Sequence, residues 1–487
     1  MRMRVWKWLG LGLLLVVVIA IAIPVLKLLG YEQLDDADRL AQKQQYLQSL
    51  SASSSTAAQR PNIVIILLDD LGYGDVGAYG AQSIATPHID SLAQNGMRFS
   101  HYYSPSPVCS PSRAAMLTGR YPPRTGLGHV VFPEGHFISN AQKISALNTR
   151  IPTEEIMLSD VLKAVGYNTA MVGKWHMGDV APSLPNDFSF DSYYGGLYSN
   201  DMKPFPLYRN RDIEEAAELD QTRMNGLYTR EVVEFVESQD TATPFFLYYA
   251  HNFPHEPLFS SPQQSGKSEA GLYGDVVEDI DHSVGELLAA LQRKGLTENT
   301  LIIFTSDNGP WYQGSPGFNR GRKNQTWEGG QRVPFIVHWP ASVGGNQLRT
   351  VPISGVDLFP TLLSVLDLPL PADRIIDGVD ISPLWRGESE LAERLIYYYG
   401  QSGATLDAVR DSRFKYHGRR GVRATGITKT LDLKAPMGPW LFDLAQDQQE
   451  SYDVSAKYPL EMQRLQEAFE ARDAEFRNNL RGWLPVK

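Results

Sequence analysis

The chain has almost no cysteine. Among its 487 residues there is one, Cys109. An intramolecular disulfide is therefore impossible, and zinc sites built from several cysteines are excluded.

The chain also lacks an excess of positive charge. Its 45 lysines and arginines face 55 aspartates and glutamates, which gives a formal net charge of −10. This balance argues against a broad electrostatic hold on nucleic acid, so we expect no nucleic-acid partner. An anionic ligand would have to be held by a local cluster of cations.

The remaining composition is that of a folded protein. Hydrophobic residues make up 43%, charged residues 21% and aromatic residues 10%. These values exclude collagen-like, coiled-coil and largely disordered chains. At roughly 150 residues per domain, the length allows about three domains, or one large α/β unit with a smaller partner.

One long uncharged run lies near the N-terminus. Residues 8–26 carry no charge and as a helix would span roughly 28 Å, about one bilayer core. Arg2, Arg4 and Lys7 precede the run, which places the N-terminus in the cytoplasm and the rest outside. We expect a membrane anchor with an exported body, in a bacterial periplasm or its equivalent. Cleavage near residues 20–22 would instead make the run a removable signal peptide and the protein secreted or periplasmic.

The chain divides into five expected parts. Residues 1–7 form a cytoplasmic tail, 8–29 the transmembrane anchor or signal, and 30–60 a linker that includes a serine-rich stretch. Residues 61–381 form the catalytic domain. Residues 382–487 form a small α+β subdomain with strand-like runs at 395–399, 414–417 and 440–443 and a helix near 459–478.

Four apolar runs are each followed at once by ionisable residues. They read as buried parallel strands alternating with helices, as in an open α/β sheet. Ligands of such sheets bind beyond the carboxyl ends of the strands, so we expect the polar groups to converge. Each group alone is typical of a turn or a surface position, whereas four at strand ends favour a site. The four apolar runs, each given with the polar residues that come after it, are 63–68 with Asp69 and Asp70, 169–172 with Lys174 and His176, 245–250 with His251 and His255, and 301–305 with Asp307 and Asn308.

The collected side chains have a clear chemical character. Asp69, Asp70, Asp307 and Asn308 offer hard oxygen ligands, which suit Ca²⁺ or Mg²⁺ better than zinc or copper. Further cations, Lys174, Lys323 and Arg113, would complete a clamp for a tetrahedral oxyanion. The expected substrate is a sulfate or phosphate ester.

The stretch Cys109-Ser-Pro-Ser-Arg113, followed by Thr118-Gly-Arg120, resembles the signature of the sulfatase family. The resemblance extends from Pro61 to about Asp453, and residues 197–201 with the overall spacing look most like the arylsulfatase branch. The other matching stretches are Asp69-Asp70, Gly173 to His176, Pro254-His255, Asp307 to Gly309, Lys323 to Gly330 and a late Leu-Phe-Asp-Leu.

This resemblance implies the fold and the chemistry. The fold would be alkaline-phosphatase-like: a large mixed, mainly parallel sheet flanked by helices, with a smaller C-terminal antiparallel sheet and helix. A separate formylglycine-generating enzyme would convert Cys109 to Cα-formylglycine, whose hydrate attacks sulfur. The metal, one Ca²⁺ in preference to Mg²⁺, would be held by Asp69, Asp70, Asp307 and Asn308, with residue 109 beside it.

The resemblance also implies roles for the other polar residues. Arg113 would orient the diol, and Lys174 and Lys323 would hold sulfate oxygens. His255 would protonate the leaving alcohol and His176 would assist deprotonation of the second hydroxyl. His251 ranks as structural because Pro254-His255 matches the family pattern.

Two other functions remain possible. A phosphodiesterase or phosphonate monoester hydrolase of the same superfamily would share the metal and the oxyanion clamp. A non-catalytic carbohydrate-binding protein would need a decayed motif set, and none of the motifs is decayed. The sequence does not choose which alcohol carries the sulfate: an aryl group, a glycolipid or a carbohydrate. Trp311, Tyr312 and Tyr198 are candidate aromatic residues at the rim of the site.

The modification predicts a mass change. In matured protein, the tryptic peptide that contains Cys109 should be about 18 Da lighter than its sequence mass, because sulfur is lost and oxygen gained. Peptide mass spectrometry measures this directly. An unmodified thiol in protein co-produced with the maturation enzyme would contradict the prediction.

Overall fold

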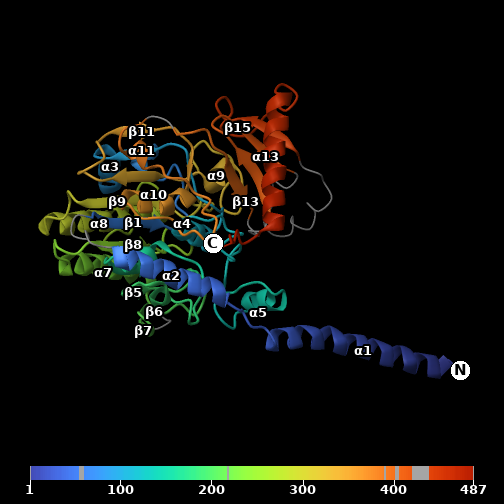
Figure 1. Ribbon diagram of the computed structural model, residues 1–487. Helices are drawn as coiled ribbons and strands as arrows, with labels where there is room; N and C mark the ends of the chain where they lie inside the picture. The colour runs from blue at the N-terminus through green and yellow to red at the C-terminus, as the bar shows by residue number, and fades with distance from the viewer. Residues whose placement is uncertain are drawn as a thin grey trace.

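The computed structural model describes residues 2–53, 60–215, 219–388, 391–400, 405–418 and 438–485. Within these ranges, a mixed sheet of ten strands forms the centre of the molecule (Figure 1). Its order is β11 (Gln347–Arg349), β2 (Met97–Phe99), β10 (Phe335–His338), β9 (Thr300–Ser306), β1 (Asn62–Leu68), β8 (Phe245–Ala250), β4 (Asn168–Gly173), β5 (Ser192–Gly195), β6 (Leu207–Arg209) and β7 (Asp212–Glu215).

The four predicted strands are β1, β4, β8 and β9, and they are neighbours in the order β9-β1-β8-β4. They run parallel: Ile65 of β1 is paired with Tyr248 of β8 and with Ile303 of β9. Every residue of β1 is buried, as expected of an apolar strand covered on both faces. The antiparallel strand β10 makes the sheet mixed, which confirms the predicted fold class.

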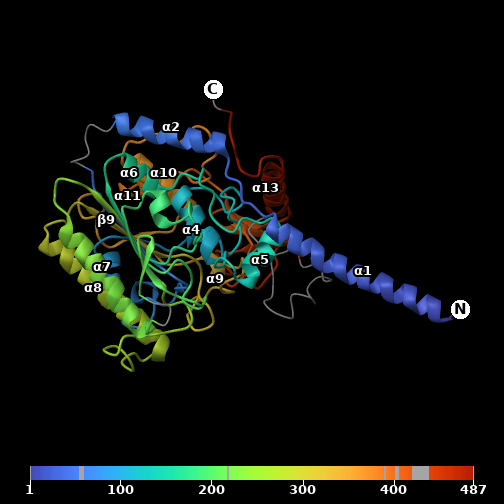
Figure 2. The same cartoon turned by 90° about the horizontal axis from the view of Figure 1, so that it is seen from below.

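Helices cover both faces of this sheet. Ile63, Ile65 and Leu67 of β1 join one hydrophobic core, and the alternate residues Val64, Ile66 and Leu68 join the other. In both views α7 and α8 lie side by side on one face (Figures 1 and 2). That face carries α3 (Pro87–Gln94), α7 (Met224–Ser238) and α8 (Gly271–Arg293); the opposite face carries α4 (Cys109–Thr118), α6 (Leu158–Ala164), α10 (Leu358–Val365) and α11 (Ser382–Trp385).

The C-terminal part is a second, smaller layer. Its antiparallel sheet has the order β13 (Ile396–Tyr399), β14 (Leu406–Arg410), β15 (Phe414–His417) and β16 (Trp440–Asp443). Helix α13 (Pro459–Asn478) packs on it through Leu465, which shares a core with Val409 and Tyr416. This arrangement agrees with the predicted antiparallel sheet and helix.

Short elements complete the described chain. They are α5 (Phe137–Ile144), α9 (Glu328–Gln331), the pair β3 (Tyr102–Tyr103) and β12 (Ile353–Ser354), and the 3-10 helices η2 (Gly77–Tyr79), η3 (Pro185–Phe188), η4 (Gln221–Arg223) and η5 (Gly355–Asp357).

The N-terminal helix α1 (Arg2–Leu29) projects away from the body (Figures 1 and 2). Its segment Gly12–Leu29 is long and apolar enough to cross a membrane, and none of its described side chains is buried. Part of the stretch expected to be a linker forms α2 (Ala37–Ser53), which is docked on the body. Leu50 is buried there, and Lys43 Nζ lies 2.8 Å from Asp160 Oδ2. The polar composition of this stretch obscured its few apolar contact residues, and residues 54–59 of it lie outside the described residues.

Glu328 on α9 connects the two sheets. Its buried carboxylate lies 3.0 Å from Lys415 Nζ on β15 and 3.6 Å from Arg410 on β14. It also accepts hydrogen bonds from Tyr103 (2.6 Å) and Tyr398 (3.0 Å). Burial alone would raise the pKa of Glu328, but the cations Lys415 and Arg410 outweigh it and hold this pKa well below its usual range.

Glu328→Gln should therefore destabilise the protein at pH 7, by about 3–5 kcal/mol, because the buried Arg410 would lose its carboxylate partner. Lys415 would lose one of two carboxylates and keep Glu450, 3.0 Å away. A depressed carboxyl pKa stabilises the fold above the unfolded-state pKa of about 4.3 and loses this effect as pH falls below it. The difference between parent and variant should stay nearly constant from pH 7 to about pH 5 and narrow as the pH falls below about 4. Urea unfolding at about pH 5 and about pH 3 measures the two differences.

The control is Glu470→Gln, since Glu470 is an exposed glutamate of α13. It should change the free energy of unfolding by less than about 0.5 kcal/mol. Equal effects of the two variants would contradict the assigned role of Glu328.

Candidate active site

The ends of the four parallel strands bring the predicted polar residues to one edge of the sheet. Because β9, β1, β8 and β4 are adjacent, the residues that follow them lie next to one another. Asp69 and Asp70 follow β1, Asp307 and Asn308 follow β9, His251 and His255 follow β8, and Lys174 and His176 follow β4.

Cys109 is the first residue of α4 and is 2% exposed. The helix ends at Gly119, which caps it in the left-handed conformation with φ +70°. The Cys109 thiol lies 3.3 Å from Asp69 Oδ1, and its sulfur is 3.5 Å from Lys323 Nζ. Burial and the Asp69 carboxylate raise the pKa of this thiol, so an unmodified Cys109 would be a poor thiolate nucleophile.

Three buried acids face three cations in the site. Lys174 Nζ lies 2.5 Å from Asp69 Oδ2, and Lys323 Nζ lies 2.7 Å from Asp70 Oδ1. Arg113 donates from Nε to Asp307 Oδ2 at 2.8 Å and from Nη1 to the backbone carbonyl of Lys174 at 2.7 Å. The charges are thus balanced pairwise inside a desolvated pocket.

The titration of these acids reflects their partners. Burial would raise the pKa of Asp69, but Lys174, His255, Arg113 and Lys323 hold it well below its usual range. The pKa of Asp307 is raised to about 6, first by burial and then by the neighbouring Asp69 carboxylate. A divalent cation beside these groups would favour the ionised form of Asp307.

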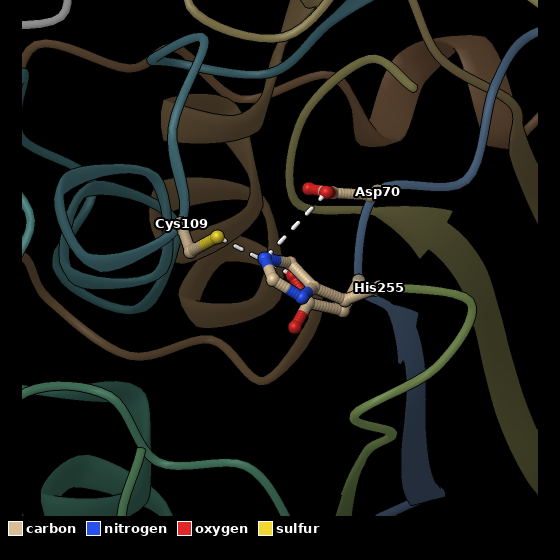
Figure 3. Close-up of side chains that lie close together, drawn as sticks. Asp70, Cys109 and His255 are labelled. Atoms are coloured by element: carbon tan, nitrogen blue, oxygen red, sulfur yellow. Dashed lines mark hydrogen bonds and ion pairs between the residues drawn. The ribbon is translucent and has the colours of Figure 1, made fainter. Parts of the chain in front are cut away.

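His255 points toward Asp70 and Cys109 (Figure 3). Its Nδ1 donates to the backbone carbonyl of Glu256 at 2.5 Å and lies 3.2 Å from Ser199 Oγ. This leaves Nε2 facing the site, 3.7 Å from Asp70 Oδ2. Burial and the nearby Lys323 lower the pKa of His255.

His176 and His251 lie deeper. His176 Nε2 is 3.1 Å from the carbonyl of Val131, so this nitrogen carries the proton. Burial and Lys174 lower the pKa of His176 well below its usual range. His251 contacts Asn225 Oδ1 (3.1 Å) and accepts from the backbone N–H of Phe253 (2.9 Å), which fits its expected structural role.

The backbone is strained at the ends of two strands. Asp70 and His176 have φ values of +67° and +62°, in the left-handed region that non-glycine residues rarely adopt. Gly173 has φ +108°, and a Cβ there would lie 1.9 Å from the carbonyl oxygen of Ala250. A glycine is therefore required where the chain turns from β4 toward Lys174.

The site can hold a divalent cation. Single ligand atoms of Asp69, Asp70, Cys109 and His255 all lie within 4.8 Å of one another. Asn308 donates from Nδ2 to Asp70 Oδ1 at 2.7 Å, and within the described ranges its buried Oδ1 has no hydrogen-bond partner. Oxygen ligands with one orphaned amide oxygen fit a hard cation. The sequence analysis expected His255 in the same site as these acids, but not among the metal ligands.

A hollow of about 550 Å³ opens over these groups. Of the three candidate rim aromatics, Trp311 lines it. Tyr312 lines an adjoining hollow of about 350 Å³, and Tyr198 is buried with its hydroxyl on Asp179, 3.0 Å away. The lining residues are Asp70, Asp201, His255, Glu256, Pro257, Trp311, Lys323 and Asn324.

Sequence reasoning did not single out Asp201, Glu256 or Asn324 as site residues. Glu256 and Asn324 directly follow predicted site residues, and that adjacency was the available signal. A larger hollow of about 820 Å³ near His101, Arg394 and Arg410 contains none of the predicted residues.

Buried acids and cations beyond the carboxyl ends of a mainly parallel sheet, with a helix-terminal cysteine above them, define an esterase-type site for a tetrahedral oxyanion. The family comparison agrees: the Sulfatase family model matches residues 61–368. The chain belongs to the sulfatase family and is a sulfuric ester hydrolase.

Named relatives are similar over most of their length. N-acetylgalactosamine-6-sulfatase of Rattus norvegicus is 39% identical, and the match covers 76% of this chain and 74% of that protein. Arylsulfatase A of Homo sapiens is 34% identical, with 83% and 85% covered. A solved sulfatase from Pseudoalteromonas sp. has a TM-score of 0.74 at 28% identity, covering 91% of this chain and 95% of that one.

The metal-binding geometry predicts a thermal shift. Removal of divalent cations with a chelator should lower Tm, and readdition of Ca²⁺ should restore it. A cation at a hundredfold excess over Kd stabilises by about 2.7 kcal/mol. Scanning fluorimetry measures the shift.

Asp307→Asn should reduce this shift, because it removes a charged oxygen beside the site, while the exposed Asp212→Asn should keep it in full. A Tm that changes neither with the chelator nor with added cation would contradict a metal site at these residues.

Proposed function

We propose that the protein cleaves sulfate esters to an alcohol and inorganic sulfate, with the hydrate of Cα-formylglycine at position 109 as the nucleophile. The observation that carries the proposal is the placement of Cys109 at the start of α4, within 3.3 Å of Asp69 and 3.5 Å of Lys323. The formylglycine would be made by a separate maturation enzyme.

The proposed metal is one Ca²⁺, held by Asp69, Asp70, Asp307 and Asn308 with the side chain of residue 109 close by. Ca²⁺ is preferred to Mg²⁺ because several protein oxygens surround the site, whereas Mg²⁺ tends to keep its own waters. When bound, the cation would raise the acidity of the hydrate and offset the negative charge of the sulfate.

In the first step, one hydroxyl of the hydrate loses its proton to the solvent, its oxygen attacks sulfur in line, and the S–O bond to the alcohol breaks. Lys174 and Lys323 would hold the sulfate oxygens, and Arg113 would orient the diol. His255 would give its Nε2 proton to the leaving alcohol. Burial and Lys323 lower the pKa of His255, and an anionic sulfate beside the ring would favour the imidazolium and so counter this shift.

In the second step, the other hydroxyl loses its proton and the C–O bond to sulfate breaks, which restores the aldehyde and releases sulfate. His176 would assist this deprotonation. Because its Nε2 is committed to the Val131 carbonyl at 3.1 Å, the lone pair is on Nδ1, and the structure gives that atom no partner within the described residues. A serine at position 109 would instead require a second attack by water at sulfur.

The proposed cellular location rests on α1. An apolar helix Gly12–Leu29 at the N-terminus with Arg2, Arg4 and Lys7 before it supports an anchor that leaves the catalytic body exported. Cleavage of the same segment would release the body into the same compartment.

A phosphodiester or phosphonate monoester is the second candidate substrate. A phosphodiester carries one negative charge, as a sulfate ester does, and the residues brought together offer ligands for one metal. A phosphonate monoester hydrolase of Agrobacterium radiobacter shares the fold, with a TM-score of 0.59 at 20% identity. We propose a sulfated carbohydrate first, because a relative at 39% identity is an N-acetylgalactosamine-6-sulfatase.

Cys109→Ala should abolish turnover of an aryl sulfate while the fold is kept, because the nucleophile is removed. Sulfate release from co-matured protein measures it, with circular dichroism to check folding. Gln94→Ala, at an exposed position of α3, is the control and should retain parent activity. Residual turnover by Cys109→Ala close to the parent value would exclude the proposed nucleophile.

A further inference from the structure

The mouth of the active-site hollow carries acids that the proposed chemistry does not use. Asp201 and Glu256 both line it, beside Trp311 and Asn324. Neither carboxylate belongs to the set of ligand atoms within 4.8 Å of one another around Cys109. They therefore face whatever part of the substrate extends outward from the sulfate.

These two acids are held in place by the loops that carry them. Asn200, which precedes Asp201, is buried and donates from Nδ2 to Pro257 O at 2.9 Å and to Gln221 Oε1 at 3.0 Å. The backbone carbonyl of Glu256 accepts from His255 Nδ1 at 2.5 Å, and the Glu256 carboxylate accepts a hydrogen bond from Gln313. The segments of Asp201 and Glu256 are thus tied to each other and to the catalytic histidine.

The cations near the mouth are already committed. Lys323 is the only lysine or arginine among the residues that line this hollow, and its Nζ lies 2.7 Å from Asp70. Arg322, in the adjoining hollow, donates from Nη1 to the carbonyls of Trp311 (2.8 Å) and Gly314 (2.6 Å). A second anionic group on the substrate would therefore lie near two carboxylates. Among these lining residues, no unpaired cation would offset the repulsion.

The same side chains suit an uncharged polyol. Carboxylates accept hydrogen bonds from hydroxyl groups, and the Asn324 amide can both donate and accept. The half-buried ring of Trp311 offers an apolar face, against which the C–H face of a pyranose can pack. The ring of Tyr312 packs against it edge-on, with the two ring centroids 4.8 Å apart.

We infer that Asp201 and Glu256 are specificity-determining residues that select sulfate esters whose neighbouring groups are uncharged, such as neutral hexosides, and reject esters flanked by a second anion, such as a hexuronate. The inference rests on the proposed sulfatase function and adds the substrate class. The sulfate is accepted because it passes beyond the acids to Lys174, Arg113 and Lys323, where charge is balanced.

The test uses two disaccharides that carry one sulfate ester and differ only in the adjacent sugar, a hexose in one and the corresponding hexuronic acid in the other. Matured full-length protein should show a kcat/KM at least about fivefold higher for the neutral compound, the factor expected from one like-charge contact near a wet surface. Raising the salt concentration should narrow the ratio.

Asp201→Asn with Glu256→Gln should bring the ratio toward one by improving the hexuronate compound. The control is Asp212→Asn, an exposed acid of β7 outside the hollow, which should leave the ratio unchanged. A parent ratio near one, a preference for the hexuronate, or an unchanged ratio in the double variant would overturn the inference.

Binding separates this inference from the proposed reaction. Calorimetry of both disaccharides with the Cys109→Ala protein needs no turnover, and the neutral compound should again bind more tightly. If the matured parent protein did not hydrolyse aryl sulfate but Cys109→Ala bound the neutral disaccharide more tightly, the proposed reaction would be refuted and the charge selection supported. If the matured parent protein hydrolysed aryl sulfate but Cys109→Ala bound both disaccharides equally, the proposed reaction would be supported and the charge selection refuted.

Discussion

The structure depends on opposite charges that are balanced away from water at the end of the central sheet. Asp69, Asp70 and Asp307 would repel one another in a dry pocket, and the pKa of Asp307 is raised to about 6 by burial and by Asp69. Lys174 and Arg113 offset this cost, since isolated buried charges are strongly unfavourable. Buried cations held in place in this way suit the anionic ester on which a sulfuric ester hydrolase acts.

The scaffold around the site is built to keep these charges in place. The left-handed backbone of Asp70 and His176 and the steric need for Gly173 show that the strand ends are held in costly conformations. Such strain persists only where the packed sheet supplies compensating burial. The second sheet contributes through Glu328, which links α9 to Lys415 and Arg410 and so fixes the segment that follows Lys323.

The proposed selection of substrates also rests on charge. Lys174 and Arg113 are buried beside Asp69 and Asp307, whereas Lys323, Asp201 and Glu256 line the hollow. An anionic ester group would gain from the three cations, and a further anion would lose at the two acids. Selection of the alcohol would then come from repulsion at the rim as much as from attraction at the centre.

The sequence by itself determined the fold class, the four parallel strands and the residues that follow them, because apolar runs and the chemistry at their ends are local patterns. It also determined the motif around Cys109. Only the tertiary structure decided that α2 docks on the body, that His255 Nε2 lies 3.7 Å from Asp70 Oδ2, and that Asp201 and Glu256 line the same hollow. These contacts join residues far apart in the chain through loops, and no periodicity or composition encodes where two loops meet.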